Sequence, residues 1–193
     1  MIISFTRTVF LFLAFFCPGF NPAQSDPNGK KADEFAKKKA ETKFTEVVST
    51  DSLGAADLMK RAVHWMTVES DKYRKSGGVT AGSKAECLAS FPVKPKELNP
   101  EVDYTGKITM KVTIECKNSR YRYTVNDIRH ESKSGRTSAG SIDNVVPECG
   151  SVAMHDLAWK KLRAEALHCA ARVVADLKEG MSADPVLEND DEW

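Results

Sequence analysis

The stretch from Lys107 to Glu131, KITMKVTIECKNSRYRYTVNDIRHE, constrains the fold of this 193-residue chain more than any other segment. Apolar and polar residues alternate on both sides of Asn118-Ser119, with the period of half-buried strands. If Asn118-Ser119 is a two-residue turn, Cys116 lies opposite Tyr121. Further along the two strands, apolar residues again lie opposite apolar residues. A slip of one residue would put apolar side chains opposite polar ones, so the pattern predicts a hairpin and also its register.

The same register divides the hairpin into two faces. The face predicted to be buried carries Val112, Ile114, Cys116, Tyr121, Tyr123 and Val125. The other face is polar, and its candidate ligand-binding residues are Lys111, Glu115, Arg122 and Asn126. A solvated polar face is also common in antiparallel sheets without any ligand. The match breaks at Asn126-Asp127, where one inserted residue, a β-bulge, would restore Met110 opposite Ile128.

Three further elements are predicted before the hairpin. Phe44–Ser49 is a candidate first strand, and Ser52 can cap a helix from Leu53 to about Lys72. The apolar face of that helix carries Leu58, Ala62, Trp65 and Met66. Residues 73–82 are rich in glycine and predict a turn region with room for a short strand. Lys84–Val93 alternates loosely and predicts a strand with Ala85, Cys87, Ala89 and Phe91 on one face.

A loop and a long helix are predicted after the hairpin. Lys133–Gly150 is rich in glycine and serine, which is typical of a mobile surface loop. Apolar residues then follow the 3.6-residue period over 153–178, and Gly180 is a plausible stop. Residues 181–193 form an acidic tail that we expect to be disordered. Together these elements predict a single α+β domain over 44–180, an antiparallel sheet with helices packed on one face.

The N-terminus has the pattern of a secretory signal peptide. Arg7 precedes the apolar run Val9–Phe16, which is too short for a bilayer crossing of about 20 residues. We expect cleavage after Ala23, followed by a polar lead-in linker over 24–43. The residues before Cys17 do not form a lipobox, so lipoprotein anchoring is not expected. The chain is therefore predicted to be secreted or periplasmic, with no transmembrane segment after signal removal.

Four cysteines remain after signal removal, Cys87, Cys116, Cys149 and Cys169, and in an oxidising compartment they are possible disulfide partners. A helix from Ala153 would place Cys169 roughly 24 Å along its axis. Cys149 would reach only about 14 Å from that start, so their pairing is disfavoured unless the helix begins later. Cys87 and Cys116 lie on apolar strand faces, where they can pair or remain buried thiols. Small core residues are an equally good interpretation.

Charge and side-chain chemistry narrow the function classes. The net charge of +1 leaves no basic footprint for nucleic acid. His155 and His168 would lie about 20 Å apart on one helix, so no metal site is expected, and no cofactor is implied. No catalytic set is recognisable. An envelope hydrolase that uses His130 and the Ser/Gly-rich loop 132–141 is the alternative, although the Gly-x-Ser-x-Gly motif is missing.

Three segments carry a family resemblance: LMKRAVHW at Leu58–Trp65, ITMKVTIECKN, and RYRYTVNDI. Together they resemble the domain of unknown function 4468 family, uncharacterised secreted or envelope proteins of bacteria. The resemblance covers roughly 44–131. It implies a TBP-like fold, a curved antiparallel sheet with helices on one face, and it implies no catalytic residue. The glycine-rich second-strand region, the proline loop and the Gly/Ser loop depart from the family pattern.

These observations predict a non-catalytic binding or interaction module that is secreted or periplasmic. Its partner would be an unknown protein or small molecule, and nucleic acid is excluded by the charge balance. The hydrolase alternative makes one structural demand. The ring of His130 must lie in a cleft close to a serine and a carboxylate.

Overall fold

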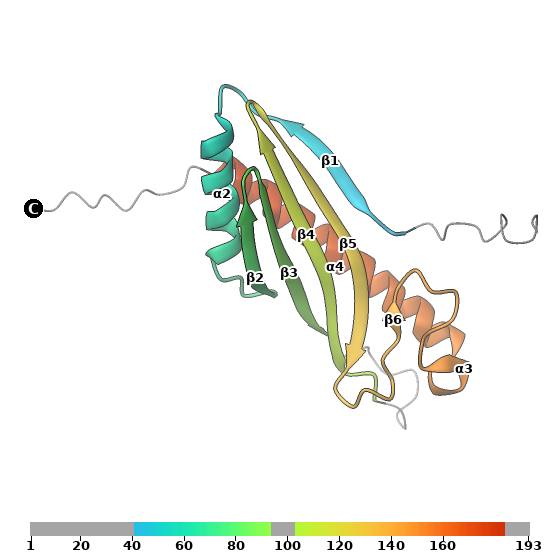
Figure 1. Ribbon diagram of the computed structural model, residues 1–193. Helices are drawn as coiled ribbons and strands as arrows, with labels where there is room; N and C mark the ends of the chain where they lie inside the picture. The colour runs from blue at the N-terminus through green and yellow to red at the C-terminus, as the bar shows by residue number, and fades with distance from the viewer. Residues whose placement is uncertain (1–40, 94–102, 184–193) are drawn as a thin grey trace, which may run out of the picture. The chain divides into compact units, whose positions relative to one another are not determined.

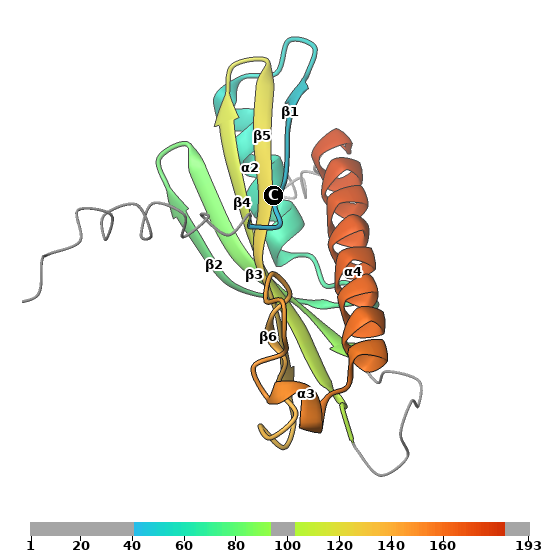
Figure 2. The ribbon, with the colours of Figure 1, turned by 90° about the vertical axis from the view of Figure 1, so that its right-hand side faces the viewer.

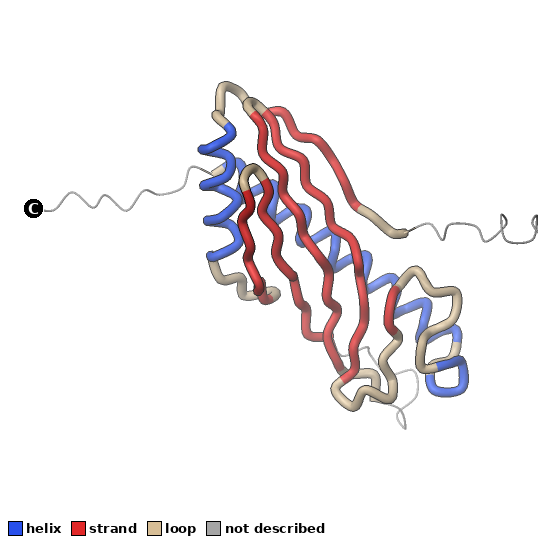
Figure 3. The backbone as a smooth tube through the Cα atoms, viewed as in Figure 1, coloured by secondary structure: helices blue, strands red, loops and turns tan. Residues whose placement is uncertain are grey.

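The part of the chain that the structure describes forms one six-stranded antiparallel sheet with helices on one face (Figures 1 and 3). The computed structural model describes residues 41–93 and 103–183, within the compact unit Lys39–Trp193. The strands are β1 (Phe44–Ser49), β2 (Arg74–Ala81), β3 (Lys84–Val93), β4 (Gly106–Lys117), β5 (Arg120–Ser132) and β6 (Gly140–Ser141). The helices are α2 (Ala55–Thr67), α3 (Gly150–Ala153) and α4 (Asp156–Ser182). The predicted signal peptide, most of the lead-in, the proline loop and residues 184–193 lie outside the described residues.

The strand order is β1-β5-β4-β3-β2, and β6 pairs with β5. The predicted hairpin is confirmed as β4–β5, with Cys116 opposite Tyr121 and the rest of the register as expected. The bulge is confirmed as well: the register shifts between Thr109 and Lys111. Asp127, the inserted residue, has the left-handed φ of 49°. Because the bulge absorbs one residue, Met110 and Ile128 both remain in the core.

The core lies between the inner face of the sheet and the two long helices. The inner sheet residues alternate along β3, β4 and β5, as the pattern predicted. Helix α4 runs along this face (Figure 2), and Leu162, Val173 and Leu177 are buried against it. Helix α2 packs beside α4, where the Trp65 indole donates to Asp176, and Leu58 and Trp65 of α2 are buried. The chain is therefore an α+β protein with its helices on one side of an antiparallel sheet.

Two predictions for the N-terminal half were wrong in detail. The glycine-rich region is an eight-residue strand, β2. Its alternation is hidden because a register shift between Ser76 and Val79 accommodates Gly77, which has a φ of 68°. Helix α2 begins at Ala55, with Gly54 as an N-cap that makes no side-chain bond, and it ends at Thr67. Ser52 is not the cap, because its φ of 60° places it in the left-handed region before the helix.

The long C-terminal helix was predicted as one unbroken element from residue 153. The structure divides it, because Met154 has extended backbone angles and its side chain enters the core between α3 and α4. Gly180 does not stop α4, which continues to Ser182. A β-carbon at Gly180 would lie 2.6 Å from Cδ1 of Trp65. This glycine therefore lets the two helices approach closely.

The Gly/Ser-rich segment after β5 is more ordered than predicted. It contributes the short strand β6 and several buried side chains, among them Ala139 and Ile142. The Thr137 hydroxyl donates to the Asp103 carbonyl at 2.8 Å. The segment therefore packs on the end of the sheet and is not simply a mobile surface loop.

Candidate functional site

The four predicted ligand-binding residues lie together on the open face of the sheet, opposite the helices. Each has an intramolecular polar neighbour: Lys111 with Glu86 at 3.0 Å, Arg122 Nε with Glu115 at 2.7 Å, and Asn126 with Glu41 at 3.0 Å. The register brings the four into one band, with Glu115 opposite Arg122 and Lys111 opposite Asn126. Only Glu115 and Arg122 pair with each other, which is a cross-strand pair of the kind that stabilises a sheet. Lys111 and Asn126 pair with carboxylates outside the four.

Glu86 on β3 is the most strongly held charge of this face. Hydrogen bonds from Lys84 and then Lys111 lower the pKa of its carboxyl group to about 2. A hollow of about 160 Å³ lies further along the face, beside Val47 and Arg122. It is smaller than the roughly 300–1,000 Å³ typical of ligand pockets. The open face is thus a flat, internally paired surface.

The structure contradicts the catalytic role considered for His130. Its side chain is fully buried, and its Nδ1 accepts a hydrogen bond from the Ala139 N–H at 3.3 Å. Nε2 must then carry the proton, and it donates to the Tyr104 carbonyl at 3.1 Å. Burial lowers the pKa of the ring, opposed by the Tyr104 carbonyl and Glu131. Both nitrogens are occupied by backbone groups, so this histidine cannot act as the base of a hydrolase.

The nearby serines also have structural partners. Ser138 Oγ accepts a hydrogen bond from the Ser132 N–H at 3.0 Å and lies 3.4 Å from the Ser132 hydroxyl. These contacts close the end of the β5 strand and its loop. The hydrolase alternative therefore lacks its proposed base, and Ser132 and Ser138 are engaged in structural hydrogen bonds.

The four described cysteines carry free thiols. Cys87 lies opposite Val112, whereas Cys116 lies beside Ser83, and the backbone N–H of Cys116 donates to the Ser83 carbonyl at 2.8 Å. This offset of four residues separates Cys87 and Cys116 by about 13 Å along the strands, well beyond the roughly 7 Å limit for a disulfide. Burial raises the pKa of Cys87, Cys116 and Cys169 to about 11. They are core residues with little thiolate character.

No group of three or more His, Cys, Asp or Glu side chains in the described ranges could hold a metal ion. Among the described residues, no helix could span a membrane.

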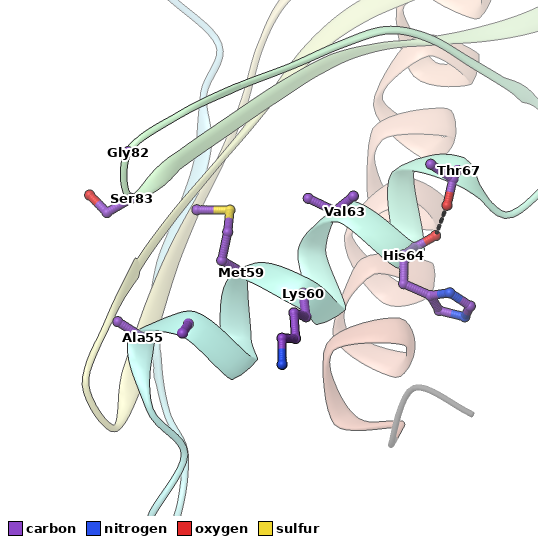
Figure 4. A pocket seen from close by; sticks show the side chains of 9 residues that line it. Ala55, Met59, Lys60, Val63, His64, Thr67, Gly82 and Ser83 are labelled. Carbon is purple, nitrogen blue, oxygen red and sulfur yellow. Dashed lines mark hydrogen bonds between the residues drawn. The ribbon is translucent and has the colours of Figure 1, made fainter. Parts of the chain in front are cut away.

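A groove that the sequence reasoning missed lies between α2 and the β2–β3 turn (Figure 4). Its volume is about 720 Å³, within the range of ligand pockets. It is lined by Ala55, Ala56, Met59, Lys60, Val63, His64 and Thr67 of α2 and by Gly82 and Ser83. Met59 and Val63 extend toward the turn, whereas Lys60 and His64 point away from it (Figure 4). The groove therefore has an apolar floor with polar groups at its margin.

A signal for this groove is present in the sequence. Ala55, Met59 and Val63 follow one another at intervals of four and form a second apolar stripe beside Leu58 and Ala62. A helix that packs one face against the core needs only the stripe that contains Leu58 and Ala62. The first stripe remains partly exposed, because the end of the β2–β3 hairpin stands away from the helix.

A cluster of polar and aromatic side chains connects α2 to α4 and β2. Asp176 of α4 accepts hydrogen bonds from the Trp65 indole at 2.9 Å and from the Tyr73 hydroxyl. The Lys75 ammonium lies 4.6 Å from the centre of the Trp65 ring and 4.0 Å from the Asp176 carboxylate. Burial lowers the pKa of Lys75, while Asp176 acts in the opposite direction. This cluster joins α2, β2 and α4, and its polar groups satisfy one another.

The sheet order and the one-sided helical layer define the TBP-like class of α+β fold. No family model matches the chain, and no curated protein matches it. A TBP-like protein from Parabacteroides distasonis has a similar structure, with a TM-score of 0.56 and 11% identity, over 77% of this chain and 97% of that one. A DUF4468 family protein from Bacteroides ovatus gives 0.53 and 10%, over 74% and 87%. The resemblance is confirmed for the fold, and at this identity it carries no function.

Proposed function

We propose that this protein is a non-catalytic binding module that holds an apolar segment of a partner protein in the groove between α2 and the β2–β3 turn. The observation that carries the proposal is the groove itself. Its floor is apolar, its volume is about 720 Å³, and the helix that forms it is held rigidly by the Asp176 cluster. Concave, mostly apolar sites of this volume are typical ligand-binding sites on proteins.

Three features favour a protein segment as the occupant. The groove runs along a helix and is open toward solvent between α2 and the hairpin (Figure 4), so a chain can enter from the side. Met59 lies in its floor, and methionine side chains adapt to different apolar partners. At the margin, the Lys60 ammonium lies 4.0 Å from the Asp57 carboxylate, which offsets its charge. Recognition would therefore depend on apolar contact.

The proposal places the module in the secreted or periplasmic space, on the signal-peptide pattern of residues 1–23. The proposal assigns no catalytic role to the described residues. Both ring nitrogens of His130, the candidate base of the hydrolase alternative, are hydrogen-bonded to backbone groups. Binding at the open sheet face through Lys111, Glu115, Arg122 and Asn126 stays a separate prediction, and the same experiment separates the two surfaces.

The experiment selects peptides from a random displayed library against the full chain and then titrates the selected peptides with variants. Val63→Asp places a charge in the groove floor and should weaken binding at least about tenfold, roughly 1.4 kcal/mol. Leu88→Asp is the matched control, because Leu88 is an exposed apolar residue on the open face. Circular dichroism would show that both variants keep the fold.

Three outcomes are informative. Loss of binding in Val63→Asp but not in Leu88→Asp supports the groove. Loss in Arg122→Ala with unchanged binding in Val63→Asp transfers the binding site to the open face. Failure to select any peptide that the folded chain binds would overturn a peptide-binding function.

A further inference from the structure

The two edges of the sheet differ in their capacity to accept another strand. β2 forms one edge, and its pairing with β3 is interrupted between Ser76 and Val79. Such a bulge is one way in which proteins protect an edge from pairing. β1 forms the other edge (Figure 1), and its six residues pair with β5 without interruption. β1 is therefore the regular, unprotected edge.

The register shows which backbone groups of β1 face outward. Residues 121, 123 and 125 of β5 direct their N–H and C=O groups toward β1, because pairs alternate from the hydrogen-bonded pair that closes the two-residue turn. The bond from the Thr50 N–H to the Ser119 carbonyl, 2.9 Å, belongs to this same alternate set. The N–H and C=O groups of Thr45, Val47 and Ser49 consequently point away from the sheet.

The side chains of β1 suit a second β1 strand. We propose that two copies of this chain pair through β1, antiparallel and centred on Val47, to form one continuous sheet. In this register Val47 meets its own copy, and Thr45 lies opposite Ser49 of the other copy. Glu46 lies opposite Val48, so no two like charges face each other across the new ladder.

Two further observations fit this pairing. Val47 is 57% exposed, and the dimer would cover it with the same residue of the second copy. The one charge of β1, Glu46, is turned toward its own helix layer. Its carboxylate accepts a hydrogen bond from the Tyr123 hydroxyl at 2.6 Å and pairs with Lys178 at 2.5 Å. This charge is thus neutralised within one copy and does not oppose the approach of a second.

The axis of such a dimer would stand perpendicular to the sheet, so both helical layers would remain on the same side. The outward groups of three β1 residues in each copy would then form six hydrogen bonds across the two-fold axis. This inference is independent of the groove, which lies beside β2 at the opposite edge.

Cysteine cross-linking tests the pairing directly. In a hydrogen-bonded antiparallel pair the two Cα atoms lie about 5.5 Å apart, within the range of a disulfide. Val47→Cys should therefore give a covalent dimer under mild oxidation. Val79→Cys is the matched control, since Val79 is a 62% exposed valine on the other edge strand, and it should stay largely monomeric.

Sedimentation of the full chain over a range of concentrations provides the second readout. Wild type and Val79→Lys should show the same monomer–dimer equilibrium. Val47→Lys places two like charges on the axis and should weaken the dimer about tenfold or more. A wild-type chain that is monomeric at the highest soluble concentration would overturn the proposal. Equal cross-linking of the two cysteine variants would overturn it as well.

Discussion

At the scale of single residues, His130 shows how a chemically suggestive side chain can serve the fold. Its place on the strand was predictable, because the hairpin register puts it opposite Ile108, as observed. Its two partners were not predictable. The Tyr104 carbonyl and the Ala139 N–H come from segments whose positions depend on tertiary packing. The ring replaces strand pairing for two backbone groups that would otherwise be buried without a partner.

The burial of His130 should make stability depend on pH. Its pKa is lowered in the folded state, so the unfolded chain binds more protons once the pH falls below about 6.5. The contribution of the neutral ring to stability should be fully present above that pH and should be lost as the pH falls below it, so the chain should be less stable at pH 5.5 than at pH 7.5. His130→Phe should be less stable at pH 7.5 by about 2–3 kcal/mol, because two backbone groups lose their partner. It should also lose part of the pH dependence.

Urea unfolding at the two pH values measures this effect. His155→Phe is the control, because His155 lies exposed at the start of α4, and it should keep the pH dependence of the wild type. An identical pH dependence in His130→Phe and in wild type would contradict the assignment of a buried neutral ring.

At the scale of elements, regular alternation predicted structure well, and interruptions in it did not. Strands β3, β4 and β5 were recognisable because buried and exposed residues alternate along each of them. β1 was predicted as a candidate strand as well, although its sequence FTEVVS does not alternate. β2 was predicted only as a turn region with room for a short strand, because Gly77 and Gly78 break its pattern at a bulge. The division between α3 and α4 was missed because Met154 fits the helical period, although its backbone is extended. The apolar pattern therefore records neither the bulge in β2 nor the extended backbone at Met154.

The register of the central hairpin can be tested with two adjacent substitutions. Ile114→Asp puts a carboxylate into a fully buried position and should cost about 5 kcal/mol, a large share of the stability of an ordinary domain. Thr113 faces the open side, with its hydroxyl 3.3 Å from Glu86. Thr113→Asp should cost only about 1 kcal/mol. Chemical denaturation would measure both, and equal losses would refute the assigned faces.

At the scale of the whole molecule, the fold class was predictable and the groove was not. The order of strands and helices leads to a one-sided α+β sheet. The groove requires α2 to lie beside the turn at Gly82, which is distant from Met59 in sequence. The band around Glu115 and Arg122 was predicted correctly as a surface, because it follows from strand register alone.

Arg61 ties the first helix to the last and should be important for global stability. It is 8% exposed, and its guanidinium donates to the carbonyls of Met181 at 3.2 Å and Ser182 at 3.0 Å. Arg61→Met keeps an apolar stem but removes these charge-assisted bonds, so it should cost about 2–3 kcal/mol. Amide hydrogen exchange should increase in the last turn of α4.

The neighbouring Lys60 provides the control. Its side chain is 69% exposed and lies 4.0 Å from the Asp57 carboxylate, so Lys60→Met should change stability by less than about 1 kcal/mol. Similar losses in the two variants would show that the link between α2 and α4 contributes little.

The contribution of α4 to the core also determines when the chain can fold during its synthesis. Ala166, Val173, Leu177 and Met181 of α4 follow every described strand along the chain, and each is at most 1% exposed. The sheet therefore cannot cover its apolar side until α4 has been synthesised. A nascent chain that has not yet released α4 from the ribosome should remain unfolded and bind chaperones.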